Sequence, residues 1–118
     1  MKKTPPWGKS VSINLYGCNK KTLSDPDLIK KFVSQVIKKI KMVAHGPTYI
    51  ERFGAGTLEG YSAMQFIETS SITIHCDEVD KRAFIDIFSC KDFDTDTAKH
   101  FAAAYFQAKD ATAVTIDR

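Results

Sequence analysis

The sequence predicts an α+β fold, an α/β two-layer sandwich in which a mostly antiparallel sheet carries two helices on one face. Short segments of alternating apolar and polar residues recur along the chain, and two longer segments carry apolar residues at helical spacing. With 118 residues, 43% of them hydrophobic, the chain has enough apolar material for one core. The expected order is β-α-β-β-β-α-β in a single domain, residues 1–118.

The first predicted strand, residues 10–17, leads into the clearest helix of the sequence. Ser24 is expected to cap the N-terminus of this helix, with Pro26 and Asp27 in its first turn. The apolar face of the helix consists of Leu28, Ile29, Phe32, Val33, Val36, Ile37, Ile40 and Val43. His45 is interpreted as a helix C-terminal residue, because Gly46 and Pro47 follow it.

The rest of the chain is predicted to be mostly strands. A Gly-rich loop is expected at residues 54–60 and a second amphipathic helix at residues 95–109. The apolar face of this second helix consists of Ala98, Phe101, Ala102, Tyr105 and Phe106. The remaining predicted strands span residues 48–53, 61–68, 71–76, 83–89 and 111–117.

Composition and charge exclude several classes of protein. The net charge of +3 is mild, and the lysines alternate with the apolar face of the first helix, which favours a solvated surface over a nucleic-acid site. The three cysteines, Cys18, Cys76 and Cys90, lack the spacing of a zinc site or a disulfide framework. No apolar run could span a membrane, and no hydrophobic stretch follows the charged N-terminus, so a cytoplasmic protein with a flexible arm at residues 1–9 is expected.

Several ordinary site interpretations are unsatisfactory. The loop GAGTLEG lacks the Lys-Ser/Thr of a phosphate loop, and the acidic residues of KDFDTDT are expected as helix caps rather than as metal ligands. His45 and His100 are not convincing ligands. Trp7 in the N-terminal arm is expected to pack either onto the domain or onto a neighbouring subunit.

Ser70, His75 and Cys90 remain as candidate catalytic residues. Ser70 precedes His75 by five residues, but no G-x-S-x-G turn accompanies the pair, so a hydrolase is a poor fit. A serine hydroxyl in a strained turn can instead attack the preceding carbonyl of its own chain. The resulting ester eliminates and leaves a pyruvoyl group at a new N-terminus. Ser71 has a simpler interpretation as a turn residue.

The segments TSSITIH and AFIDIFSC resemble the prokaryotic S-adenosylmethionine decarboxylases, whose pattern is Glu-Ser-His-x-x-Ile-His followed by a strand of the type Ala-x-Asp-x-Phe-x-Cys. The resemblance extends over most of the chain, including GKSVSINLYGCNKKTLSD and ERFGAGTLEGYS. It implies a self-cleaving proenzyme without a metal. Its pyruvoyl group would form a Schiff base with the substrate, and its product would supply polyamine synthesis.

The resemblance also implies roles for individual residues. Cleavage between Thr69 and Ser70 would give a β chain, residues 1–69, and an α chain, residues 70–118, whose Ser70 becomes the pyruvoyl cofactor. His75 and Ser62 would assist this processing. Cys90 would be the acid that reprotonates the substrate carbon after carbon dioxide leaves, because the pKa of a thiol is readily tuned.

Some positions depart from the family pattern. Thr69 and Ser71 replace the family's Glu and His, and Asp77 stands where an adenine-stacking aromatic residue is expected. Phe53 remains a candidate for stacking, and Glu78 could hold the ribose if the turn shifts by one residue.

Two alternatives therefore remain open beside S-adenosylmethionine decarboxylation. Asp77 would suit the cation of ornithine or arginine in a pyruvoyl-dependent decarboxylase of a basic amino acid. A relative that never cleaves could act as a binding or partner subunit. A homodimer is expected in each enzymatic case, because the strands at residues 61–68 and 83–89 have apolar residues on both faces.

Overall fold

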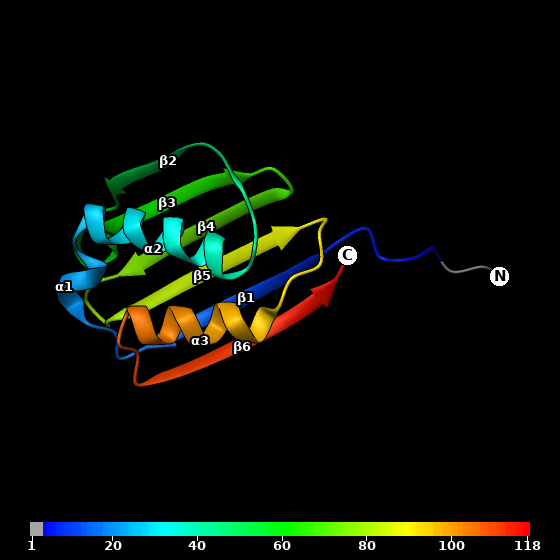
Figure 1. Ribbon diagram of the computed structural model, residues 1–118. Helices are drawn as coiled ribbons and strands as arrows, with labels where there is room; N and C mark the ends of the chain where they lie inside the picture. Colours follow the sequence, from blue (N-terminus) through cyan, green and yellow to red (C-terminus); the bar gives the residue numbers. More distant parts are fainter. Residues whose placement is uncertain (1–3) are drawn as a thin grey trace.

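The computed structural model describes residues 4–118 and contains one six-stranded sheet with its helices on one face (Figure 1). The strand order is β2-β3-β4-β5-β1-β6, and every neighbouring pair is antiparallel. The strands are β1 (Lys9–Tyr16), β2 (Ala44–Phe53), β3 (Gly60–Ile67), β4 (Ser70–Asp77), β5 (Arg82–Ser89) and β6 (Asp110–Asp117). The helices are α1 (Lys20–Leu23), α2 (Pro26–Lys39), α3 (Thr95–Tyr105) and the short 3-10 helix η1 (Gly56–Leu58). The predicted α+β class is confirmed.

The core lies between the helices and the sheet face that they cover. Alternate side chains of β1 point into it and are at most 1% exposed, namely Val11, Ile13 and Leu15. Phe32 of α2 is fully buried and packs against the rings of Phe101, Tyr105 and Phe106. Burying a side chain of this size stabilises the fold by about 1.5–3 kcal/mol. The longest helix of residues 4–118, α2, has 14 residues, and none has the length and apolarity to cross a membrane.

The first long helix begins and ends differently from the prediction. Its N-cap is Asp25, whose carboxylate accepts hydrogen bonds from the backbone N–H groups of Asp27 and Leu28, while Ser24 caps the end of α1. The helix ends at Lys39 and the chain then turns at Lys41, which has a φ of 60°. Val43, expected on the apolar face, lies beyond the helix and is exposed.

The structure of the segment after α2 also differs from the prediction. His45 does not end a helix but lies in β2, where the pairing with β3 shifts between His45 and Thr48. Pro47 lies within this shift, and a proline has no N–H for a regular ladder. Four strands, β2 to β5, separate the two long helices. Each of them overlaps a strand predicted individually, but the predicted order β-α-β-β-β-α-β has only three strands at this place.

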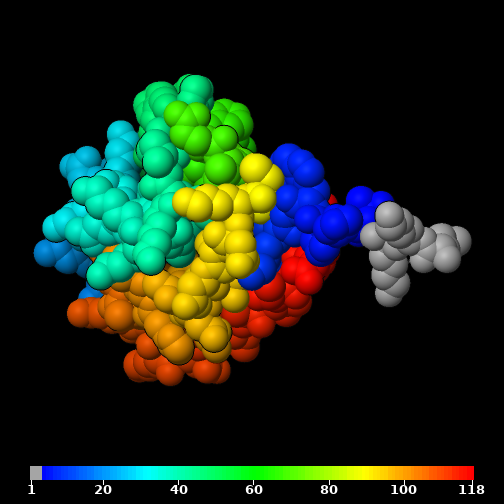
Figure 2. All heavy atoms as spheres, turned by 45° about the vertical axis from the view of Figure 1, so that its right-hand side comes forward, coloured from blue at the N-terminus to red at the C-terminus, as the bar shows by residue number. Residues whose placement is uncertain are grey.

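The N-terminal segment joins the sheet before the end of the expected arm. Lys9 is the first residue of β1, and Gly8 exchanges two backbone hydrogen bonds with Arg118, at 3.0 and 2.8 Å. The start of β1 and the last residues of β6 therefore lie side by side (Figure 2). Trp7 packs onto Phe88 of the same chain, with 5.7 Å between ring centroids. Residues 1–3 of the expected arm lie outside the described residues.

The sheet face opposite the helices is called the outer face below, and it carries Ser62, Met64 and Phe66 of β3. It is rich in half-exposed apolar side chains. These are Tyr49 (56% exposed), Met64 (45%), Phe66 (48%), Val114 (61%) and Ile116 (53%). An antiparallel sheet can leave one face to water, but an apolar surface of this kind is typical of an interaction site.

Candidate active site

Ser70 lies at the tight turn of the β3–β4 hairpin. Ile67 and Ser70 are the last paired residues of the two strands, so Glu68 and Thr69 form the turn between them. Ser70 has a φ of 154°, a value that glycine adopts far more readily than residues with a side chain. Such a conformation typically costs about 1–3 kcal/mol. Strain is therefore stored in the backbone of Ser70, directly beside the peptide bond between Thr69 and Ser70.

The carbonyl of Thr69 is held from the neighbouring strand end. The backbone N–H of Cys90 donates a hydrogen bond to it at 2.9 Å. An N–H group in this position polarises the carbonyl and would stabilise negative charge on its oxygen. Ser70 is paired with Ser89, the residue before Cys90, so Ser70 and Cys90 belong to one cluster.

The side chain of Thr69 is fixed by a buried serine that the sequence analysis did not select. The hydroxyl of Ser89, which is 0% exposed, donates to Thr69 Oγ1 at 2.8 Å and accepts the N–H of Lys91 at 3.0 Å. Thr69 in turn donates to the sulfur of Met42 at 3.3 Å. Ser89 ends a strand whose other inward residues are apolar, and a polar residue at such a position is the signal that could have identified it.

Cys90 has the one exposed thiol of the chain's three cysteines. It lines a hollow of about 300 Å³ together with Trp7 and Lys9. Burial raises the pKa of Cys18 to about 11 and that of Cys76 to about 12, so both of these thiols stay protonated in the core. Cys90 is therefore the thiol that a small molecule can reach.

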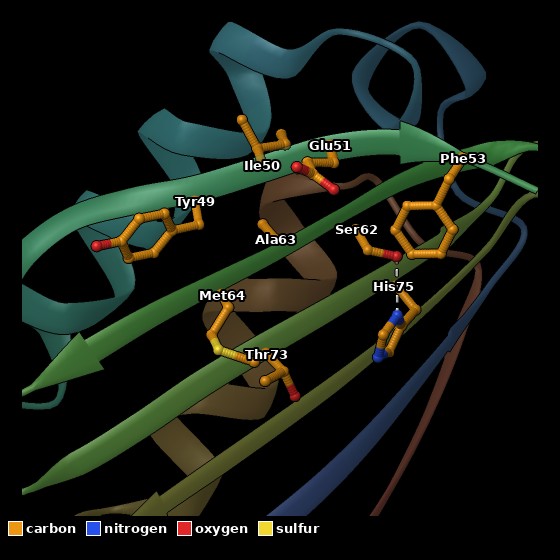
Figure 3. Close-up of a pocket in the computed structure, with 9 residues that line it drawn as sticks. All are labelled: Tyr49, Ile50, Glu51, Phe53, Ser62, Ala63, Met64, Thr73 and His75. Atoms are coloured by element: carbon orange, nitrogen blue, oxygen red, sulfur yellow. Dashed lines mark hydrogen bonds between the residues drawn. The ribbon is translucent and has the colours of Figure 1, made fainter.

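Ser62 and His75 form a second cluster on the outer face (Figure 3). They are paired across β3 and β4, and Ser62 Oγ shares a hydrogen bond of 2.9 Å with His75 Nδ1. The ring of Phe53 lies beside them, and all three line a hollow of about 390 Å³. A serine and a histidine in this contact can move a proton.

The two clusters do not meet within one chain. Five residues separate Ser70 from His75 along β4, and at about 3.3 Å per residue this corresponds to about 16 Å. The structure thus brings Ser70 close to Cys90, and Ser62 close to His75 and Phe53, but it does not bring His75 to Ser70.

Asp77 and Glu78 are each paired with an arginine. Asp77 accepts hydrogen bonds from Arg82, with Nε at 2.8 Å and a terminal nitrogen at 2.7 Å. Glu78, whose side chain is 13% exposed, accepts from Arg52 at 2.5 Å, and Arg52 also binds Glu59 at 2.6 Å. Neither carboxylate lines the hollow beside Ser62. Within residues 4–118, no three His, Cys, Asp or Glu side chains are grouped so that they could hold a metal ion.

The sequence pattern that defines the S-adenosylmethionine decarboxylases matches residues 9–118 of this chain. The chain belongs to the S-adenosylmethionine decarboxylase family. The family expected from TSSITIH and AFIDIFSC is thereby confirmed, and membership makes the protein a carboxy-lyase that acts on a small molecule.

Known members of the S-adenosylmethionine decarboxylase family resemble the chain in sequence and in fold. It is 30% identical over 115 residues to the S-adenosylmethionine decarboxylase proenzyme of Bacillus velezensis, covering 94% of this chain and 85% of that protein. It is 32% identical over 90 residues to the arginine decarboxylase proenzyme of Pyrobaculum arsenaticum, covering 75% of this chain and 65% of that protein. The adenosylmethionine decarboxylase of Aquifex aeolicus has the same fold, with a TM-score of 0.82 at 16% identity over 98% of this chain and 92% of that one.

Proposed function

We propose that this chain cleaves itself between Thr69 and Ser70, that Ser70 becomes a pyruvoyl group, and that the cleaved enzyme decarboxylates S-adenosylmethionine. Decarboxylated S-adenosylmethionine would then serve as the aminopropyl donor for polyamine synthesis. The observation that carries the proposal is the Thr69–Ser70 peptide, which is strained at Ser70 and accepts the N–H of Cys90 at its carbonyl oxygen.

The cleavage chemistry uses groups that this chain supplies. The Ser70 hydroxyl adds to the Thr69 carbonyl carbon, with the N–H of Cys90 donating to the oxygen that gains charge. The C–N bond then breaks to leave an ester, and loss of the Ser70 α-proton expels Thr69 as a free carboxylate. Hydrolysis of the remaining nitrogen group takes up one water and releases one ammonia. The Ser62–His75 pair is the proposed proton carrier for these steps.

A pyruvoyl group formed from Ser70 would supply a carbonyl that can take up the electrons left by a departing carboxylate. Cys90 follows Ser89, which pairs with Ser70, so its thiol is the proposed donor of the proton that replaces carbon dioxide on the substrate. Phe53 is the proposed ring for stacking against the nucleobase, and it lies beside Ser62 and His75.

A homodimer reconciles these roles with the distance between the two clusters. We propose that the outer faces of two chains pack together around a two-fold axis that lies between the faces and runs across the strands. This operation places the Ser70 end of β4 over the partner's opposite strand end, where the Ser62–His75 pair lies. It would also bury the half-exposed Met64 and Phe66.

The pairing of Asp77 and Glu78 with arginines bears on the choice of substrate. Asp77 was the main reason to consider ornithine or arginine, but its charge is already balanced by Arg82. Glu78 is paired with Arg52, which orients its carboxylate and partly balances its charge. The similarity to an arginine decarboxylase proenzyme keeps a basic amino acid as the second candidate substrate.

Intact-protein mass spectrometry of the purified chain beside a Ser70→Ala variant tests the proposal. We expect two fragments, residues 1–69 and 70–118, with the second lighter by one ammonia than a peptide that starts with serine. The Ser70→Ala chain is expected to stay in one piece. If the wild-type chain remains intact on incubation, the remaining hypothesis is that the protein is an unprocessed, non-catalytic relative of the family. A cleaved chain that releases carbon dioxide from arginine or ornithine but not from S-adenosylmethionine would select the second candidate.

Ser89 provides a subtler test of the same turn. We expect Ser89→Ala to slow cleavage roughly tenfold, because it leaves the Thr69 hydroxyl and the Lys91 N–H without their partner and loosens the scissile peptide. Thr69→Val removes the same hydrogen bond from the other side, so the double variant should be no slower than the slower single one. The measurement is the fraction of intact chain against time. If Ser89→Ala is cleaved at the wild-type rate and only its melting temperature falls, Ser89 contributes to stability and not to cleavage.

A further inference from the structure

The hollow beside Ser62 and His75 has an unusual distribution of charge. It lies on the outer face at the β2 edge of the sheet, and its walls are mainly apolar, including Tyr49, Phe53 and Met64. Glu51 is its one acidic or basic lining residue apart from His75. The fixed charge of this hollow is therefore negative in a chain whose net charge is +3.

Glu51 differs from the nearby carboxylates in having no cationic partner. Arg82 is paired with Asp77, and Arg52 is paired with both Glu59 and Glu78. Across residues 4–118, no ion pair involves Glu51, whose side chain is exposed. Glu51 is thus free to bind a positive charge from outside the chain.

The position of Glu51 relates it directly to the proposed reaction. It is paired with Ser62 across β2 and β3, and Ser62 contacts His75. Tyr49 and Phe53 lie two residues away on either side along β2, so both rings flank it on the same face, each about 7 Å along the strand (Figure 3). A carboxylate between aromatic rings in a mainly apolar hollow is suited to an organic cation, through charge attraction and cation–π contact.

We propose that Glu51 binds the positively charged group of the substrate and so determines which substrates the enzyme accepts. This inference rests on the proposed function. The cation is the sulfonium of S-adenosylmethionine if that is the substrate, or the side-chain cation of a basic amino acid in the second case. Asp77, the residue that the sequence suggested for such a charge, is replaced in this role by Glu51.

Binding of ligands that cannot react separates charge recognition from catalysis. Isothermal titration calorimetry of the purified protein would compare dimethylsulfonioadenosine, which carries a sulfonium, with methylthioadenosine, its neutral thioether counterpart. Both lack the amine that would condense with a pyruvoyl group. We expect Glu51→Gln to weaken the sulfonium ligand roughly tenfold and to leave the affinity of the neutral ligand unchanged.

Asp86→Asn is the matched control, because it removes the same charge from the outer face at a residue outside the hollow, three strands away from β2. It should preserve the preference for the sulfonium ligand. Equal weakening of both nucleosides by Glu51→Gln would assign Glu51 to the ribose hydroxyls and overturn the inference. Unchanged binding of both would overturn it as well.

A third ligand distinguishes the source of the cation. If the protein binds butylguanidine rather than the sulfonium nucleoside, and Glu51→Gln weakens this binding, the cation site stands and the substrate is a basic amino acid. Calorimetry measures binding and does not depend on cleavage. A chain that stays intact in the mass spectrum would therefore contradict the proposed function, but it would leave the calorimetric test of Glu51 open. In such an uncleaved chain, loss of selectivity for cations in Glu51→Gln would support a cation site at Glu51 but would overturn its role in choosing a substrate.

Discussion

A chain carrying His75→Ala is expected to stay intact when produced alone and to be cleaved when produced together with a Ser70→Ala chain. In the mixed dimer, the partner supplies the Ser62–His75 pair that the cleaving chain lacks. The reason is the separation of about 16 Å between Ser70 and His75 along β4, which no side chain can span. General acid–base assistance typically contributes about 10²–10⁴ to a rate, so its loss should leave cleavage hardly detectable.

The measurement is intact mass spectrometry of the two chains, distinguished by affinity tags. Only the His75→Ala chain can be cut, because its partner lacks the serine. A partner that carries both Ser70→Ala and His75→Ala is the matched control and should not restore cleavage. The proposal of a composite site formed by two chains would be wrong in either of two cases. The His75→Ala chain could cleave alone as well as it does with a partner, or the Ser70→Ala partner could fail to restore its cleavage.

The second large effect is expected for Cys90→Ala. This variant should still be cleaved, because the contribution of Cys90 to the scissile peptide is its backbone N–H, which alanine retains. Decarboxylation, measured as carbon dioxide released per pyruvoyl group, should fall by about 10²–10⁴, since the proposed proton donor is gone.

The other two cysteines serve as controls for this prediction. Cys18→Ala and Cys76→Ala remove buried thiols, which are 3% and 9% exposed, so these variants should lower the melting temperature and leave the turnover of each pyruvoyl group unchanged. Full activity of Cys90→Ala would assign the proton transfer to another group. Failure of Cys90→Ala to cleave would show that its side chain acts already in processing.

Much of the fold could be predicted because the alternation of apolar and polar residues along a strand indicates which side chains are buried. In β4, Ile72 and Ile74 are at most 1% exposed and His75 lies on the other face, as the pattern of this segment indicates. The helix start was ambiguous, because Ser24 and Asp25 are both good caps and the sequence also contains the short helix α1. His45 was misassigned because the bulge before Thr48 hides the strand pattern.

The candidate site was harder to predict because it depends on contacts between distant residues. The pairing of Ser62 with His75 follows from the register of β3 and β4, and a slip of one residue would have put the two on opposite faces. Arg52 neutralises Glu78 from 26 residues away, so the apparent freedom of that carboxylate could not be judged from its neighbours in the sequence.

The position of β1 in the sheet has a consequence for the protein after cleavage. Residues 1–69 would supply β1, β2 and β3, yet β1 lies between β5 and β6, which belong to residues 70–118. The two fragments would therefore interlock and could separate only by breaking three strand pairs, β3–β4, β5–β1 and β1–β6. Once unfolded, however, two pieces would have to find each other before the sheet could form again. Maturation would thus turn a chain that folds by itself into an assembly whose thermal inactivation is in effect one-way.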